Sequence, residues 1–282
     1  MCDHHHDDQH EPRDDERQTD RRGFLKAGVA AGATAALAAG AAPGTAAAAT
    51  DPYAPPAKGA LPETGFTLDR ERVALVITDP QIDFLSPKGV TWGVVGKSVE
   101  EHGTVGNIKR LLSAAKGADM TVVISPHYYY PSDHRWRFGG PLEKLMHAIG
   151  MFDRPNPYDT SSLDGSGADF MPEYKDEIMD GKTIICSPHK VYGPEANDVV
   201  LQLRKARIDQ VILAGMSANL CVESHLRELL EQGFEVAVVK DATAAAKLPE
   251  GDGYLAAIIN FRYIANALWS TDEAVDKING KA

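Results

Sequence analysis

The chain has 282 residues, of which 43% are hydrophobic and 24% charged, and its formal net charge is −11. These values are typical of a globular protein with one large domain or two small ones. They exclude general nucleic-acid binding, because there is no basic excess to meet phosphates. The three cysteines are too few for a disulfide framework.

The first 49 residues have the character of a targeting segment. Arg21 and Arg22 are consecutive and are followed by Phe24, Leu25 and an uncharged run, 27–49, composed mainly of alanine and glycine. The run ends in small residues suited to cleavage, and the whole pattern resembles a bacterial twin-arginine export signal. A single membrane anchor is the alternative, but so much alanine and glycine makes a poor lipid-spanning helix. We therefore expect a cleaved signal and an exported protein without stable membrane insertion.

The remainder of the chain predicts a linker followed by one domain. Residues 50–64 are rich in proline and alanine, as linkers are, and residues 65–282 contain short apolar runs separated by helical patterns. Such alternation is typical of parallel strands covered on both faces. It predicts a three-layer α/β/α domain, Rossmann-like, with a parallel six-stranded sheet. The predicted strands are 73–78, 121–124, 183–186, 210–214, 234–239 and 263–267, and the predicted helices are 99–116, 195–206, 221–233 and 271–278.

Three chemically active side chains follow different predicted strands. Asp79 comes after the first strand, Lys190 after the third and Cys221 after the fourth. Because parallel strands end at one edge of the sheet, where α/β domains bind their ligands, we expect these side chains to lie together. Each alone has an ordinary explanation: Asp79 as a turn residue, Lys190 as a surface charge and Cys221 as a buried inert thiol. Their joint placement favours a catalytic site.

Cys221 lies at the turn between a predicted strand and a helix. That helix is predicted by the apolar spacing of Val222, Leu226, Leu229 and Leu230. Free backbone N–H groups at such a turn favour a thiolate and can also hold an oxyanion. The position therefore suits a nucleophile.

The segments ALVITDPQIDF, SPHKVYGP and ILAGMSANLCVESHLRELLEQGFEVAVVKDATAA resemble the isochorismatase-like cysteine hydrolases. The resemblance covers roughly 73–267 and implies hydrolysis of amide, ureido or carbamoyl C–N bonds through a thioester. It implies Cys221 as the nucleophile, Asp79 as the general base and Lys190 as the positioning cation. It also implies a cis peptide between Met216 and Ser217, and an oxyanion hole made by the N–H groups of Ser217 and Cys221.

Alternatives to this reaction remain open. Nicotinamidase members of the family bind a metal through an aspartate and histidines after the second strand. Here Ser125 stands at the aspartate position, although His127 and His134 are present. We expect no metal and no cofactor; a metal-dependent nicotinamidase-type amidase and a catalytically inactive small-molecule-binding protein are the two alternatives. Asp83 is a second candidate base, but the resemblance assigns that role to the first acidic residue of its motif.

Candidates for substrate contacts come from the loops that follow the strands. The long segment 126–181 is rich in aromatic residues and glycine, and such loops often carry function. We expect a small amide-type substrate, and a homo-oligomer in which the apolar stretch 265–269 helps to cover an interface. The candidate substrate-binding residues are Phe84, Trp92, His127, His134, Arg135 and Tyr192.

Overall fold

A parallel sheet of six strands forms the centre of the computed structural model, which describes residues 51–62 and 64–281. The strand order is β3-β2-β1-β4-β5-β8, and every neighbouring pair is parallel, which confirms the predicted fold class. The predicted export signal lies outside the described residues. The strands of the sheet are β1 (Val73–Thr78), β2 (Thr121–Ser125), β3 (Ile184–Ile185), β4 (Gln210–Met216), β5 (Glu235–Ala244) and β8 (Ala267–Trp269).

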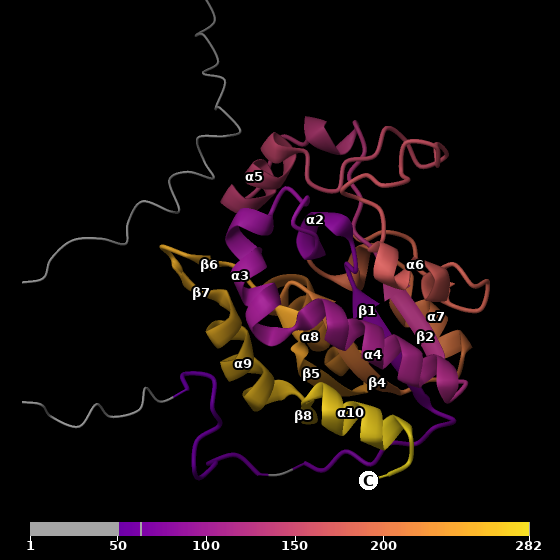
Figure 1. Cartoon of the computed structure of the whole chain (residues 1–282), viewed down its shortest axis with the longest axis vertical. Coiled ribbons are helices and arrows are strands. Elements are labelled where there is room, and N and C mark those ends of the chain that lie inside the picture. The colour runs from indigo at the N-terminus through magenta and orange to yellow at the C-terminus, as the bar shows by residue number, and fades with distance from the viewer. Residues whose placement is uncertain (1–50, 63, 282) are drawn as a thin grey trace, which may run out of the picture. The chain divides into compact units, whose positions relative to one another are not determined.

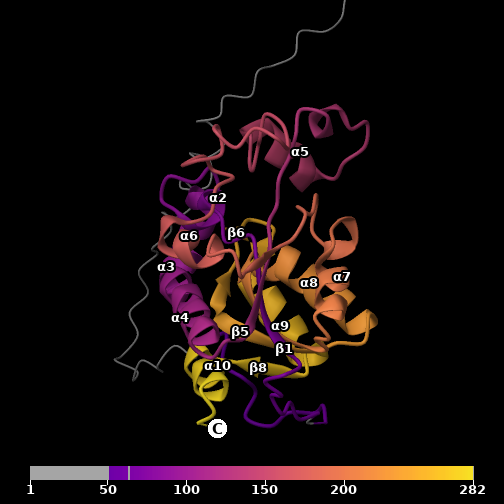
Figure 2. The ribbon, with the colours of Figure 1, turned by 90° about the vertical axis from the view of Figure 1, so that its right-hand side faces the viewer.

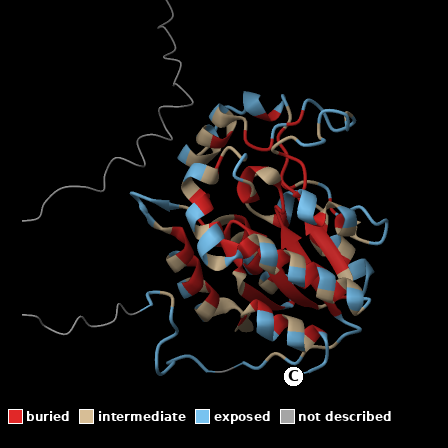
Figure 3. Ribbon diagram, viewed as in Figure 1, coloured by how far each residue is buried: buried red, intermediate tan, exposed pale blue. Residues whose placement is uncertain are grey.

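Helices cover both faces of the sheet, because alternate side chains of each strand point to opposite faces. Leu75 and Ile77 of β1 belong to one apolar cluster, whereas Ala74 and Val76 belong to another. Figure 2 shows the two helical layers on either side of the strands, and the strands themselves are buried in Figure 3. The first layer contains α3 (Trp92–His102), α4 (Thr104–Gly117), α6 (Pro172–Ile178) and α10 (Thr271–Ile278), and the second contains α7 (Val199–Lys205), α8 (Glu223–Glu231) and α9 (Gly253–Ile264).

One predicted helix and one predicted strand need correction. The predicted helix 99–116 is divided at Gly103, whose left-handed φ of 63° ends α3 and starts α4, as glycine permits. The predicted strand 263–267 is wrong, because Tyr263 lies in α9 and the strand begins at Ala267. Helix α9 is capped by the Asp252 side chain, which accepts a hydrogen bond from Leu255 N, and its apolar residues surround much of the helix.

The apolar stretch 265–269, which was expected to help cover an interface, largely forms the edge strand β8. Trp269 in β8 is only 7% exposed and packs edge-on against Phe66, with ring centroids 5.1 Å apart. Self-association stays a prediction. Within residues 51–62 and 64–281, no helix combines the length and apolar character needed to cross a membrane.

The long segment between β2 and β3 lies beyond the carboxyl ends of the strands (Figure 1). Asp83 helps to hold it, because its Oδ2 accepts a hydrogen bond from Phe152 N at 2.7 Å. Oδ1 of Asp83 accepts from Val90 N at 3.2 Å, in the loop that precedes α3. Burial raises the pKa of the Asp83 carboxyl. Both carboxylate oxygens of Asp83 are thus engaged by backbone N–H groups of loops, and the role of Asp83 as a second candidate base stays a prediction. The short elements here and elsewhere are α2 (Ile82–Leu85), η1 (Asp133–Arg135), α5 (Pro141–Ile149), η2 (Pro194–Ala196), η3 (Ala218–Val222), β6 (Lys247–Leu248) and β7 (Gly251–Asp252).

Candidate active site

Asp79 and Cys221 meet at the carboxyl ends of the two central strands, β1 and β4. Together with His127 and His189 they form a buried group in which one donor atom from each side chain lies within 4.8 Å of the others. Cys221 is 3% exposed, and Asp79 and His189 are fully buried. The chain leaves β1 toward β2 on one side and returns through β4 on the other, so the group lies at the topological switch point where such sheets bind ligands.

Asp79 presents one of its carboxylate oxygens to the other side chains of this group. Its backbone is left-handed, with φ of 46°, a conformation that aspartate tolerates better than most residues. Oδ1 is hydrogen-bonded to His189 Nε2 at 2.7 Å, whereas Oδ2 has no hydrogen-bond partner among the described residues. A carboxylate held by one oxygen and free at the other is positioned to accept a proton.

Cys221 lies in η3, the π-helical turn between β4 and α8. Burial, and then the charge of Asp79, hold the pKa of its thiol well above the ordinary value, although the backbone N–H groups of Ser217 and Cys221 act in the opposite direction. The sequence-based expectation of a favoured thiolate is thus corrected: the resting group is a thiol, because desolvation outweighs the helix N-terminus. The expected cis peptide between Met216 and Ser217 is present.

The structure does not bring Lys190 to this group. Its Nζ donates instead to Asp133 Oδ2 at 2.6 Å and to the Tyr128 carbonyl at 3.0 Å, over the Tyr130 ring. His189, one position earlier, is the residue that pairs with Asp79. The motif SPHKVYG correctly predicts that this segment lies at the carboxyl edge of the sheet. Side chains of an extended segment alternate in direction, and the motif does not reveal whether His189 or Lys190 points toward Asp79.

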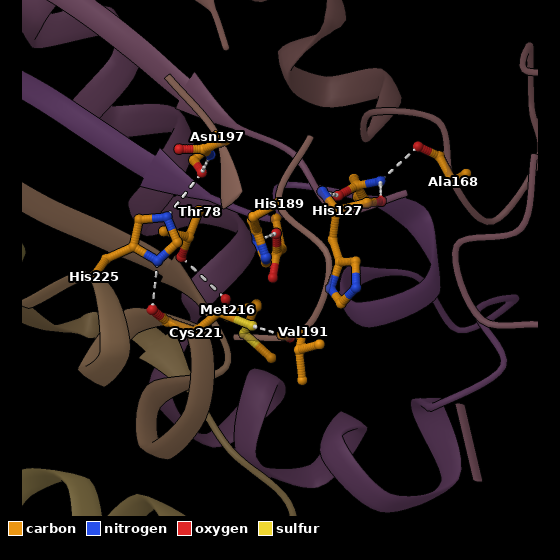
Figure 4. A network of polar contacts seen from close by, with 12 residues as sticks. Thr78, His127, Ala168, His189, Val191, Asn197, Met216, Cys221 and His225 are labelled. Carbon is orange, nitrogen blue, oxygen red and sulfur yellow. Dashed lines mark hydrogen bonds and ion pairs between the residues drawn. The ribbon is translucent and has the colours of Figure 1, made fainter. Parts of the chain in front are cut away.

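His127 completes the group from the segment after β2. Its main chain is fixed by Gln81, whose side chain donates to the His127 carbonyl at 2.9 Å and accepts from its N–H at 2.8 Å. The His127 and His189 ring centroids are 4.6 Å apart, and Figure 4 shows both rings and the Cys221 sulfur gathered from three segments. Burial, followed by the neighbouring His189, holds the pKa of His127 well below its ordinary value, so His127 is neutral.

A second layer of polar contacts supports Cys221 from behind. His225 Nδ1 donates to the Cys221 carbonyl at 2.7 Å, and His225 Nε2 lies 2.8 Å from Ser125 Oγ. Asn197 Nδ2 donates to the same hydroxyl at 2.9 Å. Burial lowers the pKa of His225 to about 3. Nε2 of the neutral ring therefore accepts a hydrogen bond from the Ser125 hydroxyl. Ser125, considered from the sequence only as the residue at the metal-binding aspartate position, thus helps to anchor η3 and the first turn of α8.

The other candidate substrate residues lie at varying depths around the group. Phe84 is buried and packs edge-on against Phe152. His134 pairs with Asp153 at 2.7 Å and is not part of the four-residue group that contains His127. The metal-dependent alternative requires both histidines at one site. Trp92 is half-buried at the start of α3, Arg135 is exposed, and Tyr192 is half-buried. Burial and, after it, the charges of Glu143 and Cys221 raise the pKa of Tyr192. Cys186 and Cys221 are both buried free thiols.

A thiol beside a carboxylate at the edge of a parallel sheet is an arrangement in which a neighbouring base can activate a nucleophile. The model of the isochorismatase domain matches residues 73–273, so the chain belongs to the isochorismatase family. Among curated proteins, YecD of Escherichia coli O157:H7 is 45% identical over 49 residues, which is 17% of this chain and 26% of the relative. YwoC of Bacillus subtilis (strain 168) is 30% identical over 91 residues, which is 32% of this chain and 46% of the relative. Both are uncharacterized isochorismatase family proteins, and the alignments span less than half of either.

Solved structures share the fold at low identity. A cysteine hydrolase from Pseudomonas syringae pv. phaseolicola 1448A superimposes with a TM-score of 0.65 and 19% identity, covering 79% of this chain and all of that one. An N-carbamoylsarcosine amidase from Thermoplasma acidophilum superimposes with a TM-score of 0.50 and 18% identity, covering 71% of this chain and 97% of that one. These similarities show the isochorismatase-like hydrolase fold and, with the family, indicate a hydrolase.

Proposed function

We propose that this protein is a cysteine hydrolase that cleaves an amide, ureido or carbamoyl C–N bond of a small molecule through a thioester on Cys221. The observation that carries the proposal is the convergence of the Cys221 thiol and the Asp79 carboxylate in one buried group, with Asp79 Oδ2 lacking a hydrogen-bond partner among the described residues. The fold shared with an N-carbamoylsarcosine amidase supports this bond type by analogy alone. Burial of the group favours a small substrate.

In the proposed reaction, Asp79 moves one proton in each half. Oδ2 takes the proton from the thiol as the sulfur attacks the substrate carbonyl carbon, and the N–H groups of Ser217 and Cys221 hold the developing oxyanion. Collapse breaks the C–N bond, and protonated Asp79 gives its proton to the leaving amine. Asp79 then deprotonates water, which attacks the thioester and releases the acid as the thiol re-forms with that proton.

His189 serves as the positioning residue in place of Lys190. Its Nε2 is hydrogen-bonded to Oδ1 of Asp79, and Oδ2, which has no partner among the described residues, is the oxygen that the proposed mechanism uses for the proton transfers. Lys190 holds Asp133 and the segment after β2, at a distance from the proton transfers.

The test is a screen of small amides, ureas and carbamoyl compounds with three proteins: wild type, Cys221→Ala and Cys186→Ala. Cys221→Ala should fold, since it removes one small side chain, and should abolish turnover; Cys221→Ser should be nearly as inactive, because Asp79 is a weak base for an alcohol. Cys186→Ala, the matched buried-thiol control, should retain activity. Mass spectrometry of a quenched reaction should show the acyl group on Cys221. Full activity of Cys221→Ala would refute the mechanism, and ligand binding without turnover in the wild type would favour the inactive binding protein.

We also propose export by the twin-arginine route as a separate property of the whole chain. It rests on the Arg21–Arg22 pair and the alanine-rich run behind it.

A further inference from the structure

The buried group at the ends of β1 and β4 has the composition of a metal site as well as of a nucleophile and its base. It offers a carboxylate oxygen, two imidazole nitrogens and a thiol sulfur, from Asp79, His127, His189 and Cys221. Thiolate and imidazole ligands select zinc or copper over magnesium and calcium. We propose that these four side chains bind a soft divalent ion, Zn²⁺ above all, and that the bound ion blocks the thiol.

The spacing of the four donors fits tetrahedral coordination after a small contraction. Zinc binds sulfur at about 2.3 Å and nitrogen or oxygen at about 2.0–2.2 Å, which places neighbouring ligand atoms roughly 3.5 Å apart. Donor atoms of the group already lie within 4.8 Å of one another. Side-chain shifts of about 1 Å bring them to that spacing.

Unsatisfied polar atoms provide an independent indication of a ligand. Among the described residues, Asp79 Oδ2, both ring nitrogens of His127 and Nδ1 of His189 have no hydrogen-bond partner. His127 is 1% exposed and the other two are fully buried. Buried polar atoms without partners are costly, and the thioester chemistry uses only the Asp79 oxygen. The nitrogens of His127 are left for another role, and a metal ion satisfies one of them at once.

The number of ligands determines the effect of the ion on the reaction. Catalytic zinc sites keep a position open for water or substrate, whereas sites with four protein ligands are closed. With all four side chains engaged, the sulfur is coordinated and Asp79 is no longer free to accept a proton. Zinc is thus an inhibitor here rather than a cofactor; the binding site stands on geometry alone, and the loss of turnover rests on the proposed function. Turnover should then survive exhaustive chelation.

Cobalt spectroscopy on the full chain tests the site without any substrate. Cys2 and the histidines at positions 4–6 and 10 have side chains of metal-binding types, so Cys2→Ser serves as the reference protein and the histidines are common to all variants. After chelation and dialysis, Co²⁺ should give a near-ultraviolet thiolate-to-cobalt band. Cys221→Ala should lose the band, while Cys186→Ala, the thiol control, should keep it.

Loss of one histidine should weaken the site strongly. His127→Gln should reduce Zn²⁺ affinity by more than the roughly 10–100-fold typical of a residue that only supports a ligand, and His102→Gln, an imidazole control outside the group, should not. Zn²⁺ should also protect Cys221, but not Cys186, from iodoacetamide.

Two results would overturn the inference: a cobalt band that is absent or that persists in Cys221→Ala, and turnover that rises with added Zn²⁺. A band that depends on Cys221, in a protein whose turnover does not, would instead leave the metal site standing and refute the thioester mechanism.

Discussion

At the scale of single residues, Asp79 has two opposite effects on the Cys221 thiol. The negative carboxylate raises the pKa of the thiol and so disfavours the nucleophilic form. The same carboxylate is the group within reach that can remove the proton. The proposed mechanism therefore requires proton transfer to Asp79 during attack and does not use a preformed thiolate.

Asp79→Asn separates these two effects. Asparagine tolerates the left-handed backbone as aspartate does, so the fold should survive. Removing the charge should lower the thiol pKa, and each unit increases the thiolate about tenfold at neutral pH. Iodoacetamide should label Cys221 faster, while turnover falls by about 10²–10⁴ through loss of the base. Cys186 provides the control, because burial and, after it, the charge of Asp198 raise the pKa of its thiol: Asp198→Asn should speed labelling of Cys186 alone. Slower labelling in Asp79→Asn would show that the thiol is activated by its base before attack.

At the scale of elements, the end of β4 is fitted closely against β1. Gly215 has φ of 114°, and a Cβ there would lie 2.0 Å from the Thr78 carbonyl oxygen. Thr78 Oγ1 in turn donates to the Met216 carbonyl at 3.0 Å. The backbone that carries Ser217 and Cys221 is therefore positioned by the strand that carries Asp79.

Gly215→Ala should destabilise the domain by at least about 3 kcal/mol, from backbone strain and the collision with backbone atoms. Gly106→Ala is the matched control, because Gly106 lies in α4 with no atom within 4 Å of the added Cβ; it should stabilise by about 0.5–1 kcal/mol. Urea unfolding measures both. Equal effects of the two substitutions would mean that the two strands separate easily at this point.

The elements also show what the sequence could and could not predict. Continuous apolar runs located β1, β2 and β4 to within two residues, because strands buried on both faces contain little else. Helix α9 was missed, and its end was assigned to a strand, because a helix that is apolar on most sides lacks the periodic pattern that distinguishes the two. Cys221 and Asp79 were found from their places after strands. The pairing of Asp79 with His189 rather than with Lys190 was not predictable, because it depends on which of two adjacent side chains points toward Asp79.

At the scale of the whole molecule, buried neutral histidines make the fold sensitive to acid. The pKa of His225 is lowered to about 3, and that of His127 well below its ordinary value. An unfolded histidine titrates near 6.5. Below that pH these histidines bind protons in the unfolded chain but stay neutral in the folded one. The free energy of unfolding therefore falls as the pH falls from about 6.5 toward 3.

The free energy of unfolding should therefore drop by roughly 2 kcal/mol for each of these two histidines between pH 7.5 and 5. Urea titrations at a series of pH values, with a chelator present to exclude metal, measure the slope. His225→Gln is less stable at neutral pH but should show a shallower slope. An unchanged slope in that variant would contradict the assignment of His225 as a neutral buried ring.

The export proposal also belongs to the whole chain. Arg21→Lys together with Arg22→Lys should retain the protein in the cytoplasm, because the receptor reads the paired arginines. Cell fractionation with an antibody against the domain measures the distribution, and Lys26→Arg, a nearby change that keeps the pair, should leave it unaltered. Normal secretion of the double variant would exclude this route.

The central pairing of β1 with β4 has a consequence for the order of events during folding. Thr78 and Ala214, joined across these strands, are 136 positions apart, and the two ends of the site are separated by a similar length of chain. Contacts of such high contact order form slowly, because loop closure precedes any gain from them. Under the proposed function, nascent and partly refolded chains should therefore lack hydrolytic activity until β4 has paired with β1, so the recovery of activity during refolding should lag behind the first collapse.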